Sequence, residues 1–199
     1  MAVVLTNPAS LPRGQRERRQ RIVQAAIALL ETGEYDAIQM RDVAERAAVA
    51  LATIYRYFTS KEHLYAAAML EWASGYPSTG RAGSVAGGSD EARLRALMRR
   101  AVRAFERYPQ MMRAEIVLES SNDPNARALW DEFAAHNTAT LTAAMSSTDP
   151  GTATAIVDVA NAVMVTRLRS WALGRCTIRD VDKSVQRALD LLFGATATN

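Results

Sequence analysis

Residues 39–61 have the sequence QMRDVAERAAVALATIYRYFTSK, and this stretch decides the fold of the chain. Its first half places apolar residues at the i, i+3, i+4 and i+7 spacing of one helix face: Met40, Val43, Ala44 and Ala47. Its second half repeats the pattern on a stripe formed by Leu51, Ile54 and Phe58. Two short helices joined by a tight turn near Val49 must cross steeply. The stretch therefore predicts a helix-turn-helix, a motif that places its second helix in the DNA major groove.

The residues around the second helix suit contact with DNA. Ala50 and Ala52 are small enough for the backbone to approach base edges, and Leu51 can contact a thymine methyl group. The candidate DNA contacts are Arg19, Gln39, Arg41, Ala50, Leu51, Ala52, Thr53, Tyr55, Arg56, Tyr57 and Lys61. We assign bases to Leu51 and Thr53, and phosphates to Arg19, Tyr55, Tyr57 and Lys61. Two alternatives stay open: Leu51 packs into the core, or the whole stretch is a helical hairpin that does not bind DNA.

A basic segment precedes the motif. Residues 13–21 contain five arginines and one acidic residue, Glu17. Alone, such a segment is more often a solvated helix end, but directly before a helix-turn-helix it favours phosphate contact. The formal net charge of +3 at pH 7 is by itself weak evidence for a nucleic-acid partner.

Together these residues resemble the signature of the TetR family of transcriptional regulators. The resemblance covers about residues 16–66, and its most specific part is the run from Tyr55 to Glu62, YRYFTSKE. It implies an all-α chain of about nine helices. It also implies a three-helix DNA-binding domain at residues 15–66, followed by a helical bundle for effector binding and dimerisation at residues 67–199.

The chain departs from the family pattern at three positions. Ala48 stands where the family has a turn glycine, Ala50 where it has a serine or threonine cap, and Gln39 where a threonine often caps the preceding helix. Losing a capping side chain costs about 1 kcal/mol. We therefore expect weaker caps and a changed turn, with the fold retained. Ser60 is the expected cap of the next helix.

The remaining chain is expected to be helical throughout. We expect a mobile tail at residues 1–14 and a helix at residues 16–33 that Gly33 ends. Residues 75–90 are rich in glycine and serine and are expected to form a loop. Further helices are expected from near residue 60 to 72, from 90 to near Pro109, and at about 110–121, 124–146, 150–173 and 178–193. No alternating pattern of a β-strand occurs.

The predicted helix at residues 150–173 is apolar on nearly every side. Between residues 155 and 165 only Asp158 and Asn161 interrupt the apolar residues. Such a helix must bury a second face, so with residues 178–193 it predicts a homodimer through a four-helix interface. The alternative is a core helix within one subunit.

Composition limits the classes of function. The 199 residues are 49% hydrophobic, which suits a soluble protein with a sizeable core. A single cysteine, Cys176, precludes an internal disulfide, and neither a signal-peptide core nor an apolar run of membrane-spanning length is present. These features predict a cytoplasmic protein without membrane contact. The two histidines, His63 and His136, lack partners at metal spacing, so we expect no metal, cofactor or catalytic residue.

Soft and aromatic residues in the C-terminal part could line a ligand pocket, because methionine adapts to irregular cavities. The candidates are Phe105, Met111, Met112, Trp130, Phe133, Met164 and Trp171, although most such residues are simply core. Three segments, at 15–19, 34–41 and 180–192, are similar to actinobacterial repressors of cholesterol and steroid breakdown. That similarity implies a steroid or acyl-CoA effector.

The sequence therefore predicts a ligand-responsive repressor. It would bind a pseudo-palindromic operator in double-stranded DNA as a homodimer and would be released by a small apolar effector. A helical protein-interaction module and a cofactor-free enzyme remain the alternatives, and neither would bind DNA.

Overall fold

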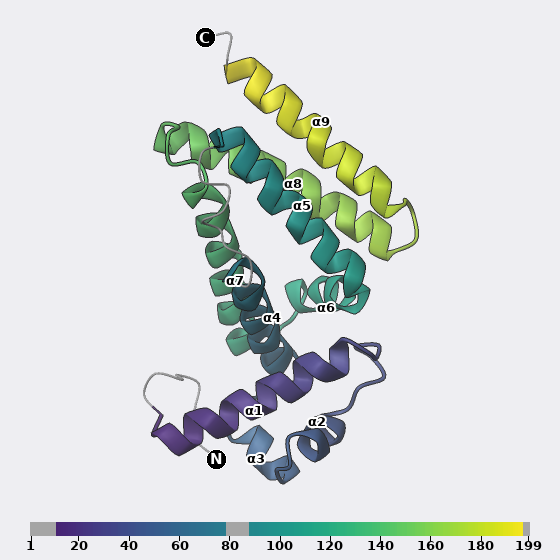
Figure 1. Ribbon diagram of the computed structural model, residues 1–199. Coiled ribbons are helices and arrows are strands. Elements are labelled where there is room, and N and C mark those ends of the chain that lie inside the picture. The colour runs from purple at the N-terminus through teal and green to yellow at the C-terminus, as the bar shows by residue number, and fades with distance from the viewer. Residues whose placement is uncertain (1–10, 79–87, 197–199) are drawn as a thin grey trace. The chain divides into compact units, whose positions relative to one another are not determined.

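The computed structural model describes residues 11–78 and 88–196, and within these ranges the chain forms helices and turns without a β-strand. The helices are α1 (Arg13–Leu30), α2 (Met40–Arg46), α3 (Leu51–Tyr55), α4 (Lys61–Ser78), α5 (Asp90–Arg107), α6 (Pro109–Glu119), α7 (Pro124–Ala143), α8 (Pro150–Ala172) and α9 (Ile178–Thr196) (Figure 1). The all-α class predicted from the sequence is confirmed. Among the described residues, no helix combines the length and the apolarity that a membrane span requires.

Some helix ends differ from the sequence prediction. Helix α1 begins at Arg13 rather than Arg16, because the carbonyl of Pro12 accepts the N–H groups of Gln15 and Arg16 at 2.9 and 3.0 Å. It ends at Leu30, three residues before Gly33, whose N–H donates to the Leu29 carbonyl at 2.8 Å. Helix α4 continues through Gly75 and Pro77 to Ser78, where a loop was expected from these two residues. The rest of that predicted loop, residues 79–87, and residues 1–10 of the predicted tail lie outside the described residues.

The chain divides into two compact units that do not follow the order of the sequence. One unit comprises Met1–Ser74 and Arg113–Phe133, and the other comprises Gly75–Met112 and Ala134–Asn199. Helices α4, α6 and α7 each contribute residues to both units.

The first unit is built on α1, which packs on α2, while α2 packs on α3. The apolar stripe of α1 is fully enclosed at Ile22, Ala26 and Leu30. Ile54 of α3 and Phe58 behind it are also fully buried. A helix as short as α3 cannot be stable alone, so it depends on this packing for its stability.

The second unit is a layer of long helices in which α8 packs on α9, and α5 packs on both (Figure 1). Helix α8 buries Ile156, Val157, Ala160, Met164 and Leu168, and α9 buries Val181, Val185 and Leu189. Gly174, at φ +72°, ends α8, and the N–H groups of Gly174 and Arg175 donate to the carbonyls of Trp171 and Ser170, both at 2.8 Å. This is the Schellman arrangement that favours glycine.

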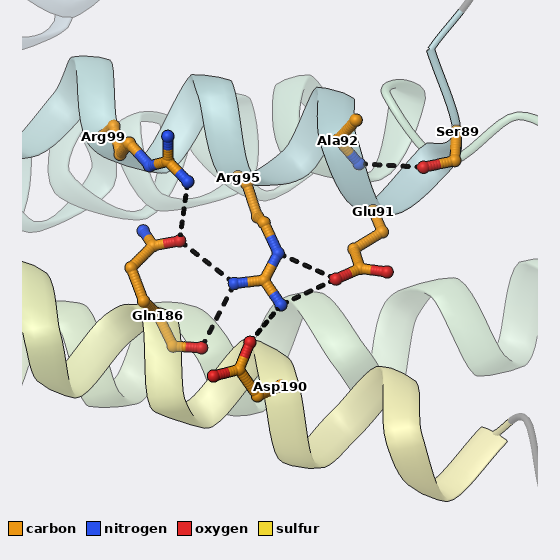
Figure 2. A network of polar contacts seen from close by, with 7 residues as sticks. All are labelled: Ser89, Glu91, Ala92, Arg95, Arg99, Gln186 and Asp190. Atoms are coloured by element: carbon orange, nitrogen blue, oxygen red, sulfur yellow. Dashed lines mark hydrogen bonds and ion pairs between the residues drawn. The ribbon is translucent and has the colours of Figure 1, made fainter.

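A polar network joins α5 to α9 in the second unit (Figure 2). The guanidinium of Arg95, whose side chain is 15% exposed, donates to Glu91 Oε1 and Asp190 Oδ1, each at 2.6 Å. It also donates to the side-chain and backbone oxygens of Gln186 at 3.0 and 3.2 Å. Arg99 donates to the same Gln186 side-chain oxygen at 3.1 Å. One arginine therefore ties the outer polar edges of two helices whose apolar faces are already packed.

Candidate nucleic-acid interface

Helix α2 has a cap that the sequence comparison with the family did not lead us to expect. The N–H of Gln39 donates to Asp42 Oδ2 at 2.7 Å, so the side chain in the first turn reaches back to the residue before the helix. This is one half of a capping box, and it supplies an acceptor although Gln39 replaces the usual threonine. The negative charge of Asp42 also lies at the favourable end of the helix dipole.

The turn between α2 and α3 closes through Ala48. Its φ is +51°, a left-handed conformation that an L-residue with a Cβ adopts at a cost of about 1–2 kcal/mol. The N–H groups of Ala48 and Val49 donate to the carbonyls of Glu45 and Ala44 at 3.1 and 3.0 Å, which again is the Schellman pattern. The turn geometry that the family achieves with glycine is therefore kept, and Ala48 carries the strain.

Helix α3 and its flanks, residues 50–56, form what we call the DNA-reading segment. Leu51 is 41% exposed and Tyr55 is 46% exposed, although both are large and apolar or aromatic. Ala50, Ala52 and Arg56 are exposed beside them. Ile54 points the other way and is fully buried. The exposed face therefore combines small, apolar and basic residues, which is the chemistry needed for base edges and phosphates.

The structure sorts the candidate DNA contacts by accessibility. The exposed ones are Gln39, Arg41, Ala50, Leu51, Ala52, Tyr55 and Arg56. Arg19, Thr53 and Lys61 are partly buried, and Tyr57 is 1% exposed. The phosphate contact assigned to Tyr57 stays a prediction, and the buried side chain would have to move to make it.

Arg19 lies over the ring of Phe58, with its guanidinium carbon 5.0 Å from the ring centroid. Its Nε is buried without a hydrogen-bond partner. Burial lowers the pKa of Arg19, and the carboxylates of Glu71 and Glu132 oppose that shift. An arginine remains charged under these conditions, so Arg19 brings a cation to the side of the unit that supports α3.

Lys61 is turned toward the chain that precedes α2. Its ammonium donates to the carbonyl of Tyr35 and lies 4.1 Å from the centroid of the Tyr35 ring. Burial lowers the pKa of Lys61, and nearby carboxylates, of which Asp36 has the largest effect, partly oppose this shift. The predicted phosphate contact of Lys61 would require the side chain to exchange this carbonyl for a phosphate.

Ser60 caps α4 as the sequence predicted, because its Oγ accepts the N–H of His63 at 3.0 Å. One partner of this turn was not predicted. The carboxylate of Asp123, at the start of α7, accepts hydrogen bonds from both Thr59 and Ser60. The sequence indicated Asp123 only as the start signal of a helix. Its contacts with Thr59 and Ser60 could not be predicted, because no local pattern indicates a partner more than sixty residues away.

The candidate pocket residues do not gather in one unit. Trp130 and Phe133 stack in the first unit, with ring centroids 4.9 Å apart. The other candidates belong to the second unit, where Phe105, Met111, Met112 and Met164 are buried and Trp171 is partly buried. Burial is what both a core residue and a pocket residue show, so the pocket stays a prediction.

Both the N-terminal and the C-terminal part of the chain match known protein families. Residues 22–68 match the family described as bacterial regulatory proteins, tetR family, and residues 87–192 match the family described as tetracyclin repressor-like, C-terminal domain. The HTH-type transcriptional repressor KstR of Mycolicibacterium smegmatis is 36% identical over 182 residues, which cover 90% of this chain and 89% of that protein.

Solved structures show the same fold. A TetR transcriptional regulator from Rhodococcus sp. RHA1 is 27% identical with a TM-score of 0.74, over 90% of this chain and 96% of the other. Thermus thermophilus FadR, a TetR-family repressor crystallised with lauroyl-CoA, has a TM-score of 0.72 at 18% identity, over 88% of this chain and 93% of the other. Because both of its parts match family sequences and a curated relative matches almost end to end, the chain belongs to the TetR family of bacterial transcriptional regulators, which bind DNA and are not enzymes.

Proposed function

We propose that this protein is a repressor that binds a pseudo-palindromic operator as a homodimer and leaves it when a small apolar effector binds. The observation that carries the proposal is the exposed face of residues 50–56, where Leu51 and Tyr55 stand out from a helix held by buried Ile54. A large apolar side chain exposed on a recognition helix loses water contact only when a partner covers it. A base edge with a thymine methyl group is such a partner.

The dimer part of the proposal rests on the surface of α8. Val159 is 49% exposed, and Ala155 and Ala162 are exposed beside it on a helix whose opposite face is fully packed. Leu191 of α9 adds a further exposed apolar side chain. An apolar stripe on the two C-terminal helices suits a self-complementary interface between two copies of the chain. Two copies would present two reading segments to half-sites about one helical turn apart, or a multiple of that distance.

The effector part rests on similarity and composition. The Thermus thermophilus neighbour binds an acyl-CoA, and the sequence resembles repressors of steroid breakdown. The candidate pocket residues Phe105, Met111, Met112, Trp130, Phe133, Met164 and Trp171 supply apolar and polarizable surface. We therefore propose a steroid or acyl-CoA metabolite as the effector.

The experiment that tests the DNA part is selection of duplexes from a random-sequence library by the purified protein. We expect an enriched sequence with two inverted half-sites, bound at least 1,000-fold more tightly than a shuffled duplex of the same composition. Equal affinity for the enriched and shuffled duplexes would contradict the proposal.

Sedimentation of the free protein tests the dimer, and Val159→Asp should yield monomers because a charge buried at an interface without a partner is strongly unfavourable. Ala135→Asp, at an exposed position on α7 outside the two C-terminal helices, adds the same charge as the matched control and should remain dimeric.

The effector is tested on the selected duplex. Steroids, free fatty acids, acyl-CoA esters and free CoA are added in parallel, and both DNA release and the thermal midpoint are measured. An effector at 100 times its Kd should stabilise the free protein by about 2.7 kcal/mol. Stabilisation without release from DNA would contradict the regulatory part of the proposal and leave the DNA-binding part standing.

A further inference from the structure

The start of α7 carries a carboxylate with two different sets of partners. Asp123 immediately precedes the helix, and its Oδ1 accepts the N–H groups of Asn125 and Ala126 at 2.8 and 3.4 Å. These N–H groups have no carbonyl partner inside the helix, so Asp123 is the N-cap of α7. One oxygen of the carboxylate is sufficient for this purpose.

The second oxygen serves the DNA-binding motif. Oδ2 of Asp123 accepts the hydroxyl of Thr59 at 2.6 Å and the hydroxyl of Ser60 at 2.5 Å. The amide of Asn125 adds a bond to the Thr59 oxygen at 3.3 Å. Hydroxyl donors to a carboxylate form short, strong hydrogen bonds. All of these residues lie in the same compact unit, although the two chain segments are 63 and 64 residues apart.

The carboxylate is ionised whenever the protein is folded at ordinary pH. Partial burial raises its pKa, but the bonds from Ser60, Thr59 and the two backbone N–H groups outweigh that effect and lower the pKa of Asp123 to about 2. Thr59 and Ser60 therefore always meet a full negative charge.

Thr59 and Ser60 connect directly to the support of the DNA-reading segment. Ser60 Oγ also accepts the N–H of His63, and the N–H of Thr59 donates to His63 Nδ1 at 3.1 Å. The His63 ring packs edge-on against Phe58, with centroids 5.3 Å apart. Phe58 is fully buried and follows α3 by three residues. A shift of the Thr59–Ser60 turn would therefore displace α3 through the contacts of His63 and Phe58.

We propose that Asp123 is a positioning residue for DNA binding: by holding Thr59 and Ser60 against the first turn of α7, it fixes the orientation of α3. The inference rests on the proposed DNA-binding function and deepens it. Helix α7 contributes residues to both compact units, and Asp123 precedes its first turn in the unit that holds the DNA-binding motif. The DNA itself need not touch Asp123 for the residue to control affinity.

The chain provides a matched control for this residue. Asp149 also precedes a proline and also caps a helix, since its Oδ2 accepts the N–H and the hydroxyl of Thr152 at 3.0 and 3.2 Å. Both of these groups belong to Thr152 of helix α8, which is not part of the DNA-binding motif. Serine is a good cap but is shorter than aspartate. Asp123→Ser should therefore keep the cap of α7 and lose the bonds to Thr59 and Ser60, whereas Asp149→Ser changes only a cap.

The measurement is affinity for the duplex that the wild-type protein selects from a random library, made at a temperature where every variant is folded. We expect Asp123→Ser and Thr59→Val each to weaken binding by on the order of ten-fold or more, because a smaller fraction of molecules holds α3 in the binding orientation. Asp149→Ser should stay within about two-fold of wild type. The double variant Asp123→Ser with Thr59→Val should bind no more weakly than the weaker single variant, since both changes break the same bond.

Salt dependence separates positioning from direct contact. A lost phosphate contact reduces the slope of log affinity against log salt by about one unit, whereas a lost orientation leaves the slope unchanged. An unchanged slope for Thr59→Val supports the proposal, and a slope reduced by one unit would overturn it. Equal affinity of Asp123→Ser and Asp149→Ser would also overturn it. If the wild-type protein selects no sequence at all, the proposed function fails first and the role of Asp123 fails with it.

Discussion

Nδ1 of His63 accepts the backbone N–H of Thr59 at 3.1 Å, so this nitrogen carries no proton in the folded protein. The side chain of His63 is almost wholly enclosed, at 2% exposure. Burial lowers the pKa of His63 from 6.5 to about 4, with a further lowering from Arg19 and an opposing effect from Asp123. The neutral imidazole is thus a structural acceptor at the end of the DNA-binding motif.

This histidine should make the protein sensitive to mild acid. Between pH 6.5 and about 4, His63 is protonated in the unfolded chain but neutral in the folded chain. The free energy of unfolding therefore falls as the pH is lowered through this range. The loss should reach about 3 kcal/mol, and it can be followed by chemical denaturation at a series of pH values. His63→Asn should flatten the curve, whatever its effect on absolute stability. An unchanged slope in the His63→Asn variant would contradict the assignment.

Ala48→Gly should stabilise the protein. Ala48 has a φ of +51°, and glycine adopts this conformation without steric cost, so we expect a gain of about 1 kcal/mol and a thermal midpoint higher by about 2–4 °C. The reciprocal variant is Gly174→Ala, at φ +72°, where an added Cβ would meet no other atom within 4 Å. It should lose a similar amount through backbone strain alone. Destabilisation by Ala48→Gly would show that the turn does not hold the strain described above.

Leu51→Ala should change base preference and leave stability nearly intact. The exposed Leu51 side chain supports few core contacts, so we expect less than about 1 kcal/mol lost in unfolding and a change of about 1–3 kcal/mol in preference at one base position. Ile54→Ala, one turn further along the same helix and fully buried, is the contrasting variant and should lose about 2–5 kcal/mol of stability. Unfolding curves and repeated selection from a random library measure both quantities. Lost stability with unchanged preference would assign Leu51 to the core.

Arg95 should contribute more to stability than an exposed arginine in an ion pair of similar length. Its guanidinium is largely enclosed between α5 and α9 and satisfies Glu91, Gln186 and Asp190, so Arg95→Met should lose about 2 kcal/mol. Arg13→Met is the control, because the Arg13 to Glu17 pair at 2.8 Å is exposed and should change stability by about 0.5 kcal/mol or less. Denaturant midpoints give the comparison. A more stable Arg95→Met variant would mean that apolar packing outweighs the network at this position.

Local patterns in the sequence were sufficient to predict most of the helices. Caps and punctuation signal them within a few residues, as at Ser60 before α4 and Asp149-Pro150 before α8. The period of apolar residues was less informative for α3, because five residues are too few to define which of two stripes is buried. Leu51 and Phe58 were placed on one stripe, yet the first is exposed and the second is enclosed.

Contacts between distant segments were beyond the reach of the sequence. Nothing local shows that Lys61 turns toward the carbonyl of Tyr35, or that Asp123 meets Thr59 and Ser60. The acceptor that Gln39 finds in Asp42 lies only three residues away, and the capping-box spacing could have indicated it. Long-range partners depend on how elements pack, whereas caps depend on neighbours along the chain.

The compact unit that contains the DNA-binding motif is made from two separate stretches, Met1–Ser74 and Arg113–Phe133. A chimera that joins the first 74 residues to the C-terminal part of another regulator would leave Thr59 and Ser60 without their own Asp123. If Asp123 positions α3 as proposed, a transplant of the DNA-binding motif has to carry both stretches together. A single crossover after Ser74 would separate Thr59 and Ser60 from the carboxylate that they contact.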